Sequence, residues 1–355
     1  MPIYKLLRPI LFSLDPEVAH ELVMSLSFLT KNKLVHQALS GFFRFEDPRL
    51  ETELFGLRFK NPIGLAAGID KNCRAIELLS SFGSGAIEVG VVSAKPQEGN
   101  DKPRVFRFPN DFALINRMGN PNIGADAAVI NLAKSKLKSF EIPPIGLNIG
   151  KTTATPIEEA TEDYVYTLKK LYDFIDYFII NVSCPNVAQY SKLQERETLN
   201  KLLAGLQAAN TLRKPILVKL SPDLNEVQIE EALGCCLENS ISGIIATNTT
   251  LTRKGITSKA PDTGGMSGKP LFEISLNKIK FIFSILKGKL PIVGVGGVAS
   301  ADNVISMMQA GANIVELYTA LIYQGPGLIK RIKMDLVKQM ERDGVKNISQ
   351  YIGNS

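Results

Sequence analysis

Short apolar stretches alternate with amphipathic stretches along the chain from about residue 61 onward. The short stretches are rich in Val and Ile, as buried β-strands are, whereas the amphipathic stretches have apolar residues at helical spacing. A helix candidate follows each strand candidate. The pattern predicts eight strands, at residues 63–66, 86–91, 145–148, 177–182, 216–220, 243–247, 292–295 and 314–317.

Eight repeated strand–helix units favour an α/β fold in which the strands close into a (β/α)8 TIM barrel of ~250 residues. We expect this barrel at residues 47–342, followed by a tail at 343–355. Polar and glycine residues follow nearly every predicted strand. Because the carboxyl ends of barrel strands meet on one face, these residues should converge on one site.

Residues 1–46 have a different pattern, with apolar stripes that predict several short helices before the barrel. One interpretation is a helical cap packed on the barrel. The other is an apolar surface that lies on a membrane or admits a lipophilic ligand.

Composition excludes several other classes of protein. The 355 residues are 45% hydrophobic, and the net charge of +6 comes from 41 basic and 35 acidic residues that are interleaved, so we predict a solvated surface and no nucleic-acid partner. The four cysteines form no CxxC pair and the two histidines lie near the N-terminus, so we predict no metal site and a reducing, cytoplasmic-side location. We expect no signal peptide and no membrane-spanning segment.

Cys184 stands between two carboxamides in the run 181–186 (NVSCPN), at the end of a predicted strand. A free cysteine is most often a small buried hydrophobe. Here Pro185 favours a rigid loop that presents the thiol. Since His20 and His36 are far away in the sequence, a proton acceptor in the barrel must be Cys, Lys, Tyr or a carboxylate.

Two lysines are further candidates. Lys219 lies at the end of a Val- and Leu-rich strand and would point into the top of the barrel, where its ammonium needs an anionic partner. A structural salt bridge is the simpler interpretation, but no acid lies nearby in the sequence before Asp223, and a flavin that carries negative charge when reduced would be a fitting partner. Lys71, next to Asp70, could equally be a surface residue at a helix start.

Several asparagines stand at strand ends or in adjoining loops, where a carboxamide offers both a donor and an acceptor. Each alone is typical of a turn, but together they suit a planar substrate with alternating N–H and C=O groups. They are Asn116, Asn148, Asn181, Asn186 and Asn248.

The loops after the seventh and eighth strands carry glycines that could bind a phosphate through backbone amides. These loops contain residues 293–297 (VGVGG) and 317–319 (LYT). A tight turn is the simpler interpretation. The run could also be half of a dinucleotide-binding fingerprint with Glu316 as the ribose acid, but that motif belongs to the first strand of its fold.

Together these residues resemble the dihydroorotate dehydrogenase family, in its class 2, membrane-associated and quinone-linked form. The similarity covers essentially the whole chain. It rests on the runs 15–20 (DPEVAH), 61–71 (NPIGLAAGIDK), 96–104 (PQEGNDKPR), 116–119 (NRMG), 148–151 (NIGK), 246–250 (ATNTT), 264–268 (GGMSG) and 294–297 (GVGG).

The resemblance implies an FMN-containing barrel that oxidises (S)-dihydroorotate to orotate in de novo pyrimidine (UMP) biosynthesis and passes electrons to a membrane quinone. It implies a quinone channel at His20, Arg107 and Tyr318. The implied FMN contacts are Ala66, Ala67, Gly68, Lys71, Asn148, Asn181, Lys219, Thr247, Gly268, Gly297, Tyr318 and Thr319. The implied substrate contacts are Lys71, Asn116, Arg117, Met118, Gly119, Asn120, Asn181, Asn186, Asn248 and Thr249.

In this resemblance Cys184 is the catalytic base, which removes the C5 proton of dihydroorotate while C6 gives hydride to the flavin. Lys71 steadies the anionic side of the substrate and Lys219 supports the flavin. Class 2 members carry serine at the base position, whereas cysteine is typical of the soluble class 1 enzymes. A thiol, with a reference pKa of about 8.5, should ionise far more easily than a hydroxyl.

Other positions also depart from the family pattern. They are Val91 for Ser or Thr, Asn120 and Pro121 for Phe and Asn, Glu316 for Gln, Cys73 for Gly, and the loop 187–192. They keep three alternatives open: a fumarate- or NAD-linked dihydroorotate dehydrogenase, a related flavoprotein that reduces another pyrimidine or ene compound, and a non-enzymatic membrane-binding module. We expect a peripheral protein on the cytoplasmic side of the cell membrane.

Overall fold

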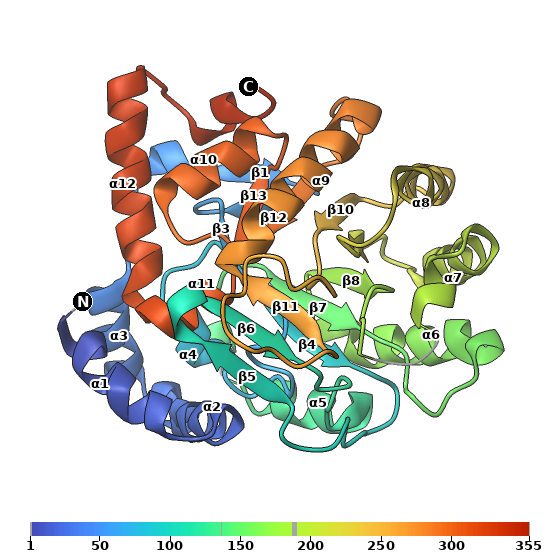
Figure 1. The fold of residues 1–355 in the computed structure, drawn as a ribbon, viewed down its shortest axis with the longest axis horizontal. Helices are drawn as coiled ribbons and strands as arrows, with labels where there is room; N and C mark the ends of the chain where they lie inside the picture. The colour runs from blue at the N-terminus through green and yellow to red at the C-terminus, as the bar shows by residue number, and fades with distance from the viewer. Residues whose placement is uncertain (1, 136, 187–189, 355) are drawn as a thin grey trace.

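Eight parallel strands close into a barrel, and helices surround it (Figure 1). The computed structural model describes residues 2–135, 137–186 and 190–354. The prediction of a (β/α)8 barrel is confirmed: three strands have the predicted bounds, and the other five differ by one residue at the carboxyl end. In barrel order the strands are β3 (Ile63–Leu65), β4 (Ala86–Val92), β7 (Ile145–Ile149), β8 (Tyr177–Asn181), β9 (Ile216–Leu220), β10 (Gly243–Ala246), β12 (Ile292–Val295) and β13 (Ile314–Leu317).

Apolar helix faces pack on the barrel wall, and polar caps fix where several helices begin. Asn225 and Gln228 form a capping box at the start of α8, and the side chain of Ser300 caps α10. The helices that follow the barrel strands are α4 (Ile76–Ser80), α5 (Gly124–Ala133), α6 (Ala160–Leu171), α7 (Arg196–Ala209), α8 (Glu226–Glu238), α9 (Phe272–Leu286), α10 (Ala301–Gln309), α11 (Thr319–Gln324) and α12 (Gly327–Asp343).

A hairpin of β1 (Thr52–Leu54) and β2 (Leu57–Phe59) closes the amino-terminal end of the barrel. Phe59 is buried among the side chains inside the barrel, and Phe55 packs against the same cluster. The sequence analysis did not predict this hairpin. It leaves the opposite end of the barrel, where the strands end, as the open one.

A three-stranded antiparallel sheet lies over that open end, and the sequence analysis missed it as well. It consists of β5 (Val105–Phe108), β6 (Ala113–Asn116) and β11 (Gly265–Gly268), with β6 in the middle. The alternating residues of β5 and β6 around a turn at Pro109 are typical of a hairpin. The run Gly265–Gly268 has no strand signal, and its pairing depends on β6.

The N-terminal residues form the predicted short helices, which lie together at one side of the barrel (Figure 1). They are α1 (Pro2–Ser13), α2 (Pro16–Ser25), a 3-10 segment (Leu26–Lys31) and α3 (Lys33–Phe43). Asp15 caps α2, and Asn32 caps α3. Inner faces of these helices contact α11, β5, α4 and α12. Their outer faces leave large apolar side chains exposed, including Leu6 at 75% and Leu34 at 76%.

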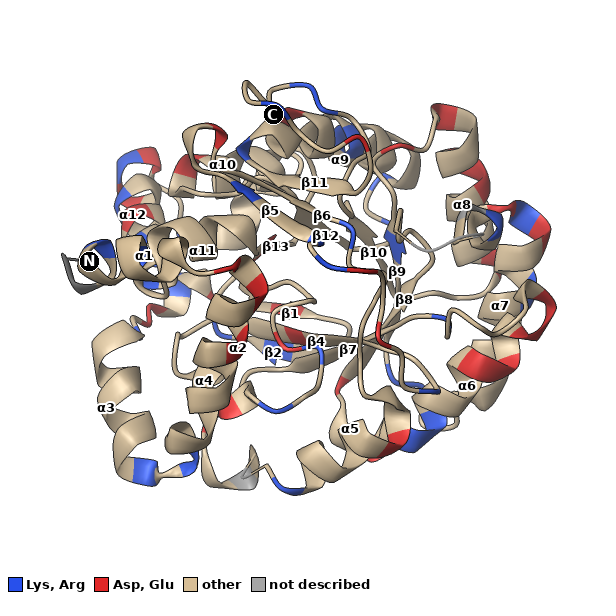
Figure 2. Cartoon of the chain, turned by 60° about the horizontal axis from the view of Figure 1, so that its bottom comes forward, with Lys and Arg blue, Asp and Glu red and all other residues tan. Residues whose placement is uncertain are grey.

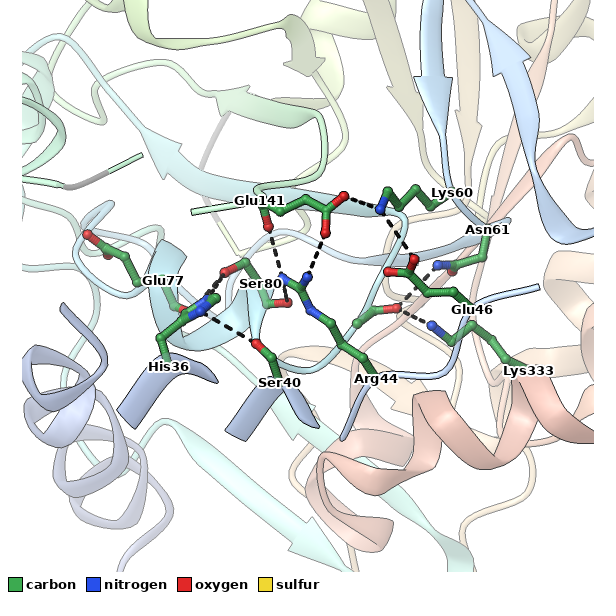
Figure 3. Close-up of polar contacts among 11 residues, drawn as sticks. His36, Ser40, Arg44, Glu46, Lys60, Asn61, Glu77, Ser80, Glu141 and Lys333 are labelled. Atoms are coloured by element: carbon green, nitrogen blue, oxygen red, sulfur yellow. Dashed lines mark hydrogen bonds and ion pairs between the residues drawn. The ribbon is translucent and has the colours of Figure 1, made fainter. Parts of the chain in front are cut away.

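A polar network fastens α3 to the loops at the amino-terminal end of the barrel (Figure 3). His36 lies 3.0 Å from the hydroxyl of Ser80. Arg44, just after α3, donates to the carboxylate of Glu141 at 3.1 Å, and Lys60 pairs with the same carboxylate. These contacts join the end of the helical layer to α4 and to the segments before β3 and β7, so they fix the layer relative to the barrel.

No helix among the described residues combines the length and the apolar character needed to cross a membrane.

Candidate active site

A cavity of about 660 Å³ lies at the carboxyl ends of the barrel strands. Every barrel strand contributes a residue at its end or in the loop that follows, from Ala66 after β3 to Tyr318 after β13. The sheet of β5, β6 and β11 supplies further lining residues, including Leu114 and Ser267. The cavity is therefore walled by the barrel below and by the small sheet above.

Most of the residues singled out from the sequence line this cavity. All twelve expected cofactor contacts do, from Ala66 to Thr319, and so do Cys184 and eight of the ten expected substrate contacts. Arg117 and Gly119 do not: the guanidinium of Arg117 instead donates to the carbonyl of Pro103 at 3.0 Å in an exposed contact. The individual roles of these residues stay predictions.

The five asparagines converge, as expected, and four of them form two pairs. The side-chain amide of Asn186 donates to the side-chain Oδ1 of Asn116 at 3.2 Å, and that of Asn248 donates to the side-chain Oδ1 of Asn181 at 3.4 Å. Each pair leaves amide groups that can turn toward a ligand. Such a wall suits a planar molecule with donors and acceptors along its edge.

Asn148 is the fifth asparagine, and its side chain is fully buried at the end of β7. Neither its Nδ2 nor its Oδ1 has a hydrogen-bond partner among the described residues. A buried polar group without a partner costs about 1–3 kcal/mol. Since Asn148 lines the cavity, a ligand with one acceptor and one donor at this position would satisfy it.

Cys184 follows β8 and lies in the cavity wall, where its thiol donates to the side-chain oxygen of Asn120 at 3.3 Å. Burial raises the pKa of this thiol to about 11, although hydrogen bonding from the backbone of Asn186 acts in the opposite direction. This raised pKa is opposite to the ready ionisation that the sequence analysis expected of the thiol. The folded environment, not the residue type alone, therefore controls this group.

Lys71 lies at the other side of the cavity, where its ammonium donates to the carbonyl of Gly68 at 2.7 Å. Burial lowers the pKa of Lys71 to about 8. His20 of α2 lies within electrostatic range, and burial together with Lys71 lowers the pKa of its imidazole to about 4. The imidazole is therefore neutral at physiological pH beside an ammonium that can lose its proton near pH 8.

Lys219 points into the barrel below the cavity, as expected, but its nearest acid is not Asp223. Its Nζ lies 3.7 Å from Oε2 of Glu88 on β4, which lies on the barrel wall away from β9. Asp223 instead accepts a hydrogen bond from the backbone of Leu251 at 2.9 Å. Sequence distance does not reveal Glu88 as a partner, because barrel closure decides which acid meets Lys219.

Aromatic contacts connect the cavity with the N-terminal helices. Arg107 of β5 donates to the carbonyl of Leu11 at 3.1 Å and lies over the ring of Phe12, 4.7 Å from its centroid. Tyr323 of α11 contacts both Phe12 and Phe112, with centroids 5.5 and 5.4 Å apart. Because Phe112 also lines the cavity, a series of ring contacts connects α1 with the cavity wall.

The departures from the family pattern lie at or near this cavity. Val91, Asn120 and Glu316 line it. Cys73 is buried in the core around the barrel. In the loop 187–192, residues 187–189 lie outside the described residues, whereas Tyr190 is buried and donates to the carbonyl of Lys151 at 3.2 Å.

Comparisons with known proteins agree with this architecture. A sequence model of the family described as "Dihydroorotate dehydrogenase" matches residues 49–340. The chain is 43% identical over 353 residues to the "Dihydroorotate dehydrogenase (quinone)" of Gloeobacter violaceus, covering 99% of each chain. It is 46% identical over 341 residues to the protein of the same description from Christiangramia forsetii, covering 94% of this chain and 98% of the relative.

The fold also resembles solved structures of DHODH from Eimeria tenella. The ligand-free structure has a TM-score of 0.87 at 32% identity, covering 96% of this chain and 99% of that one. The complex with ferulenol has a TM-score of 0.86 at 32% identity, covering 96% and 95%.

Proposed function

The chain belongs to the dihydroorotate dehydrogenase family, and we propose that it oxidises (S)-dihydroorotate to orotate and passes the electrons to a membrane quinone. It is an oxidoreductase of the CH–CH class that serves pyrimidine biosynthesis. The observation that carries this proposal is similarity over 99% of the chain, N-terminal helices included, to a relative described as quinone-dependent.

FMN is the cofactor that fits the cavity. The unpartnered amide of Asn148 supports a planar ligand with both a donor and an acceptor at its edge. At Gly297, φ is +75° and an added Cβ would lie 2.6 Å from the backbone nitrogen of Phe272, so the chain passes the cavity with no room for a side chain. Gly268 and Gly297 would hold the phosphate, and Lys219 would contact the ring. When bound, FMN supplies the acceptor for a hydride.

The substrate would lie between the paired asparagines and Lys71. Dihydroorotate has N–H and C=O groups along its ring and a carboxylate, which the amides and the ammonium of Lys71 suit. Asn116, Asn186 and Asn248 would hold the ring edge. Fixing the ring in this way aligns its C5 and C6 hydrogens with the groups that remove them.

Cys184 would remove the proton from C5 of the substrate while C6 loses a hydride. One proton and one hydride leave together, so the CH–CH bond becomes C=C and the product is orotate. Since the thiol of Cys184 gains thiolate character as the pH rises, proton removal should accelerate with pH. Asn120, which accepts from the thiol, would orient it.

The N-terminal helices would form a peripheral membrane surface and the entry for the quinone. Among Lys, Arg, Asp and Glu residues, α3 has only Lys33, whereas α6, on the opposite side of the barrel, has four (Figure 2). Arg107, Phe12 and Tyr323 lie between α1 and the cavity, where a lipophilic acceptor would pass. His20 and Tyr318 would border the same route. We place the protein on the cytoplasmic side of the cell membrane.

The test is orotate formation from dihydroorotate by FMN-loaded protein, with a soluble ubiquinone analogue, fumarate or NAD as the acceptor. We expect turnover with the quinone alone. Turnover with fumarate or NAD would support the alternative suggested by Cys184, in which the electron path is that of a soluble enzyme. No orotate with any acceptor would refute the proposed substrate.

A further inference from the structure

Three ionisable side chains meet inside the barrel beneath the cavity. They are Glu88 of β4, Lys219 of β9 and Glu316 of β13, and the side chains of Glu88 and Lys219 are only 0% and 6% exposed. Glu316 is buried as well. Of these, Lys219 and Glu316 also line the cavity, so the cluster forms part of its floor.

Strand alternation and one glycine create this cluster. Successive residues of a barrel strand point alternately inward and outward, and these three positions point inward. Gly64 of β3 pairs with Glu316 in the sheet register. A Cβ at Gly64 would lie 3.0 Å from Cγ of Glu316, so the absence of a side chain there makes room for the carboxyl group.

The contacts within the cluster pair Lys219 with one carboxyl only. Oε2 of Glu88 lies 3.7 Å from the ammonium of Lys219 and accepts from the backbone N–H of Ala67 at 3.3 Å. Glu316 and Glu88 lie on β13 and β4, the two strands that flank β3, and their carboxyls interact. Oε1 of Glu88 and Oε2 of Glu316 have no donor among the described residues. A proton held between the carboxyls would supply that missing donor.

Charge balance also favours one proton on the two carboxyls. Two ionised carboxylates beside one ammonium would leave a net negative charge in a buried space, which is costly. Burial, and secondly the charge of Glu88, raise the pKa of Glu316 well above its usual range, while Lys219 acts in the opposite direction. One bound proton leaves one carboxylate against one ammonium, which is neutral.

The surrounding strands add one more ionisable group, the phenol of Tyr177 on β8. Burial and the charges of Glu88 and Glu316 raise the pKa of this phenol well above its usual value, so it stays neutral. Asp176 faces the opposite end of the barrel, where it accepts from the backbone of Ile145 at 2.7 Å. The strands β3, β7, β10 and β12 contain no ionisable residue.

We propose that Glu88 and Glu316 hold one acidic proton between them on the floor of the cavity. Given the flavin cofactor of the proposed function, this proton makes the redox potential of the bound flavin depend more steeply on pH than it would without the proton. Reduction adds negative charge above Lys219, which increases the proton affinity of the pair. By linkage, the proton on the pair favours reduction equally. An amide at position 316 would be neutral, as the protonated carboxyl is, but it could not release a proton, so Glu316→Gln isolates the proposed proton.

The first test is infrared spectroscopy of the FMN-loaded protein and of Glu316→Gln. Wild type should show the carbonyl band of a buried protonated carboxyl at neutral pH, and Glu316→Gln should lack it. Glu238→Gln, which alters a surface carboxylate paired with Arg196, should keep the band. A wild-type spectrum without the band, or the same band in Glu316→Gln, would overturn the proposal.

The second test measures the flavin midpoint potential against pH. In wild type, we expect an additional proton to be taken up per two electrons above the pH at which the pair begins to lose its proton, and in Glu316→Gln we expect none. Parallel curves for the two proteins would overturn the redox part of the proposal. Glu88→Gln provides a second variant: Lys219 then has Glu316 as its counter-ion, so Glu316 should ionise and the band should disappear.

Thermal unfolding measured at several pH values gives a third test. The direction in which stability changes with pH follows from the raised pKa of Glu316. The folded protein keeps a proton that the unfolded chain releases above about pH 4.3, so wild type loses stability relative to Glu316→Gln as the pH rises from there. The Tm of Glu316→Gln minus the Tm of wild type should increase between pH 5 and 8. A constant difference would contradict the proton pair. Since neither the band nor the Tm needs substrate, failure of orotate formation would be distinguishable from failure of this inference.

Discussion

At the scale of single residues, the proton affinity of Cys184 depends on its position in the cavity wall. Burial raises the pKa of the thiol to about 11, and its sulfur contacts Asn120. A serine at the same position would have a hydroxyl that is much harder to ionise. If Cys184 is the base, as proposed, a cysteine at this position should become active at a lower pH than a serine would.

We predict that the rate of flavin reduction by dihydroorotate rises with pH and levels off at a lower pH in wild type than in Cys184→Ser. Cys184→Ala should lose roughly 100-fold or more in this rate, since it lacks a proton acceptor. Stopped-flow measurements of flavin absorbance at a series of pH values would check both. Identical pH profiles for wild type and Cys184→Ser would exclude Cys184 as the base.

Lys71 gives a second prediction, because burial lowers its pKa to about 8. If its ammonium binds the substrate carboxylate, the KM for dihydroorotate should rise above pH 8, by about tenfold per pH unit as the ammonium is lost. Lys71→Arg keeps the charge over this range and should remove the rise. Steady-state kinetics from pH 7 to 10 would test this, and an unchanged rise in Lys71→Arg would assign it to another group.

At the scale of elements, the N-terminal helices are amphipathic, and the barrel buries only part of their apolar surface. The inner contacts of α3 include the network around Arg44 and Glu141, whereas outer residues such as Phe28 and Leu34 are 63% and 76% exposed. Periodicity alone allowed either a cap or a membrane surface. The structure shows the cap, because one side of the helical layer packs on the barrel. The other side is exposed and apolar, which is compatible with the membrane interpretation and does not test it.

We predict that the double variant Phe28→Glu and Leu34→Glu binds phospholipid vesicles at least about tenfold more weakly than wild type. Withdrawing one large apolar side chain costs about 1.5 kcal/mol or more, and 1.4 kcal/mol corresponds to a factor of ten. Leu212→Glu is the matched control, since Leu212 is 72% exposed but lies after α7. Vesicle co-sedimentation measures binding; equal losses in the control and the double variant would mean that no membrane surface lies on these helices.

The contacts between the N-terminal helices and β5 predict the effect of removing residues 1–46. Quinone reduction should be lost, because the contacts of Arg107 with Leu11 and Phe12 disappear, while reduction of the flavin by substrate stays measurable. Stopped-flow and steady-state assays of the truncated protein would separate the two half-reactions. Unchanged quinone turnover would mean that the channel lies elsewhere.

At the scale of the whole molecule, the barrel is closed below by the β1–β2 hairpin and covered above by the sheet of β5, β6 and β11. The cavity between them contains a fully buried amide, Asn148, without a partner among the described residues. Cofactor binding should therefore stabilise the whole fold. A ligand that binds only the folded chain stabilises it by about 4 kcal/mol at a thousand times its Kd.

We predict that loading with FMN raises the Tm of wild type, and that the rise is smaller in Asn148→Ala. Asn225→Ala is the control: it removes the cap of α8, which costs about 1 kcal/mol, and should lower the Tm equally with and without FMN. Differential scanning calorimetry of both forms would test this. An equal rise in wild type and Asn148→Ala would remove the argument that Asn148 contacts the cofactor.

The sequence by itself determined the eight barrel strands, the N-terminal helices and the gathering of polar residues at the strand ends. These follow from local periodicity and from one geometric fact, that the ends of parallel barrel strands meet on one face. Asn148, Asn181 and Asn248 could be placed together for this reason, before any contact between them was known.

Only the tertiary structure decided the pairings and proton affinities inside the site. Glu88 meets Lys219, and His20 lies near Lys71, although each pair is distant in the sequence; the strand β11 exists only because β6 lies beside it. Desolvation and Coulomb energies depend on burial and on distances in space. The raised pKa of Cys184 and the proton on the Glu88–Glu316 pair are consequences of the closed barrel, which no local pattern in the chain encodes.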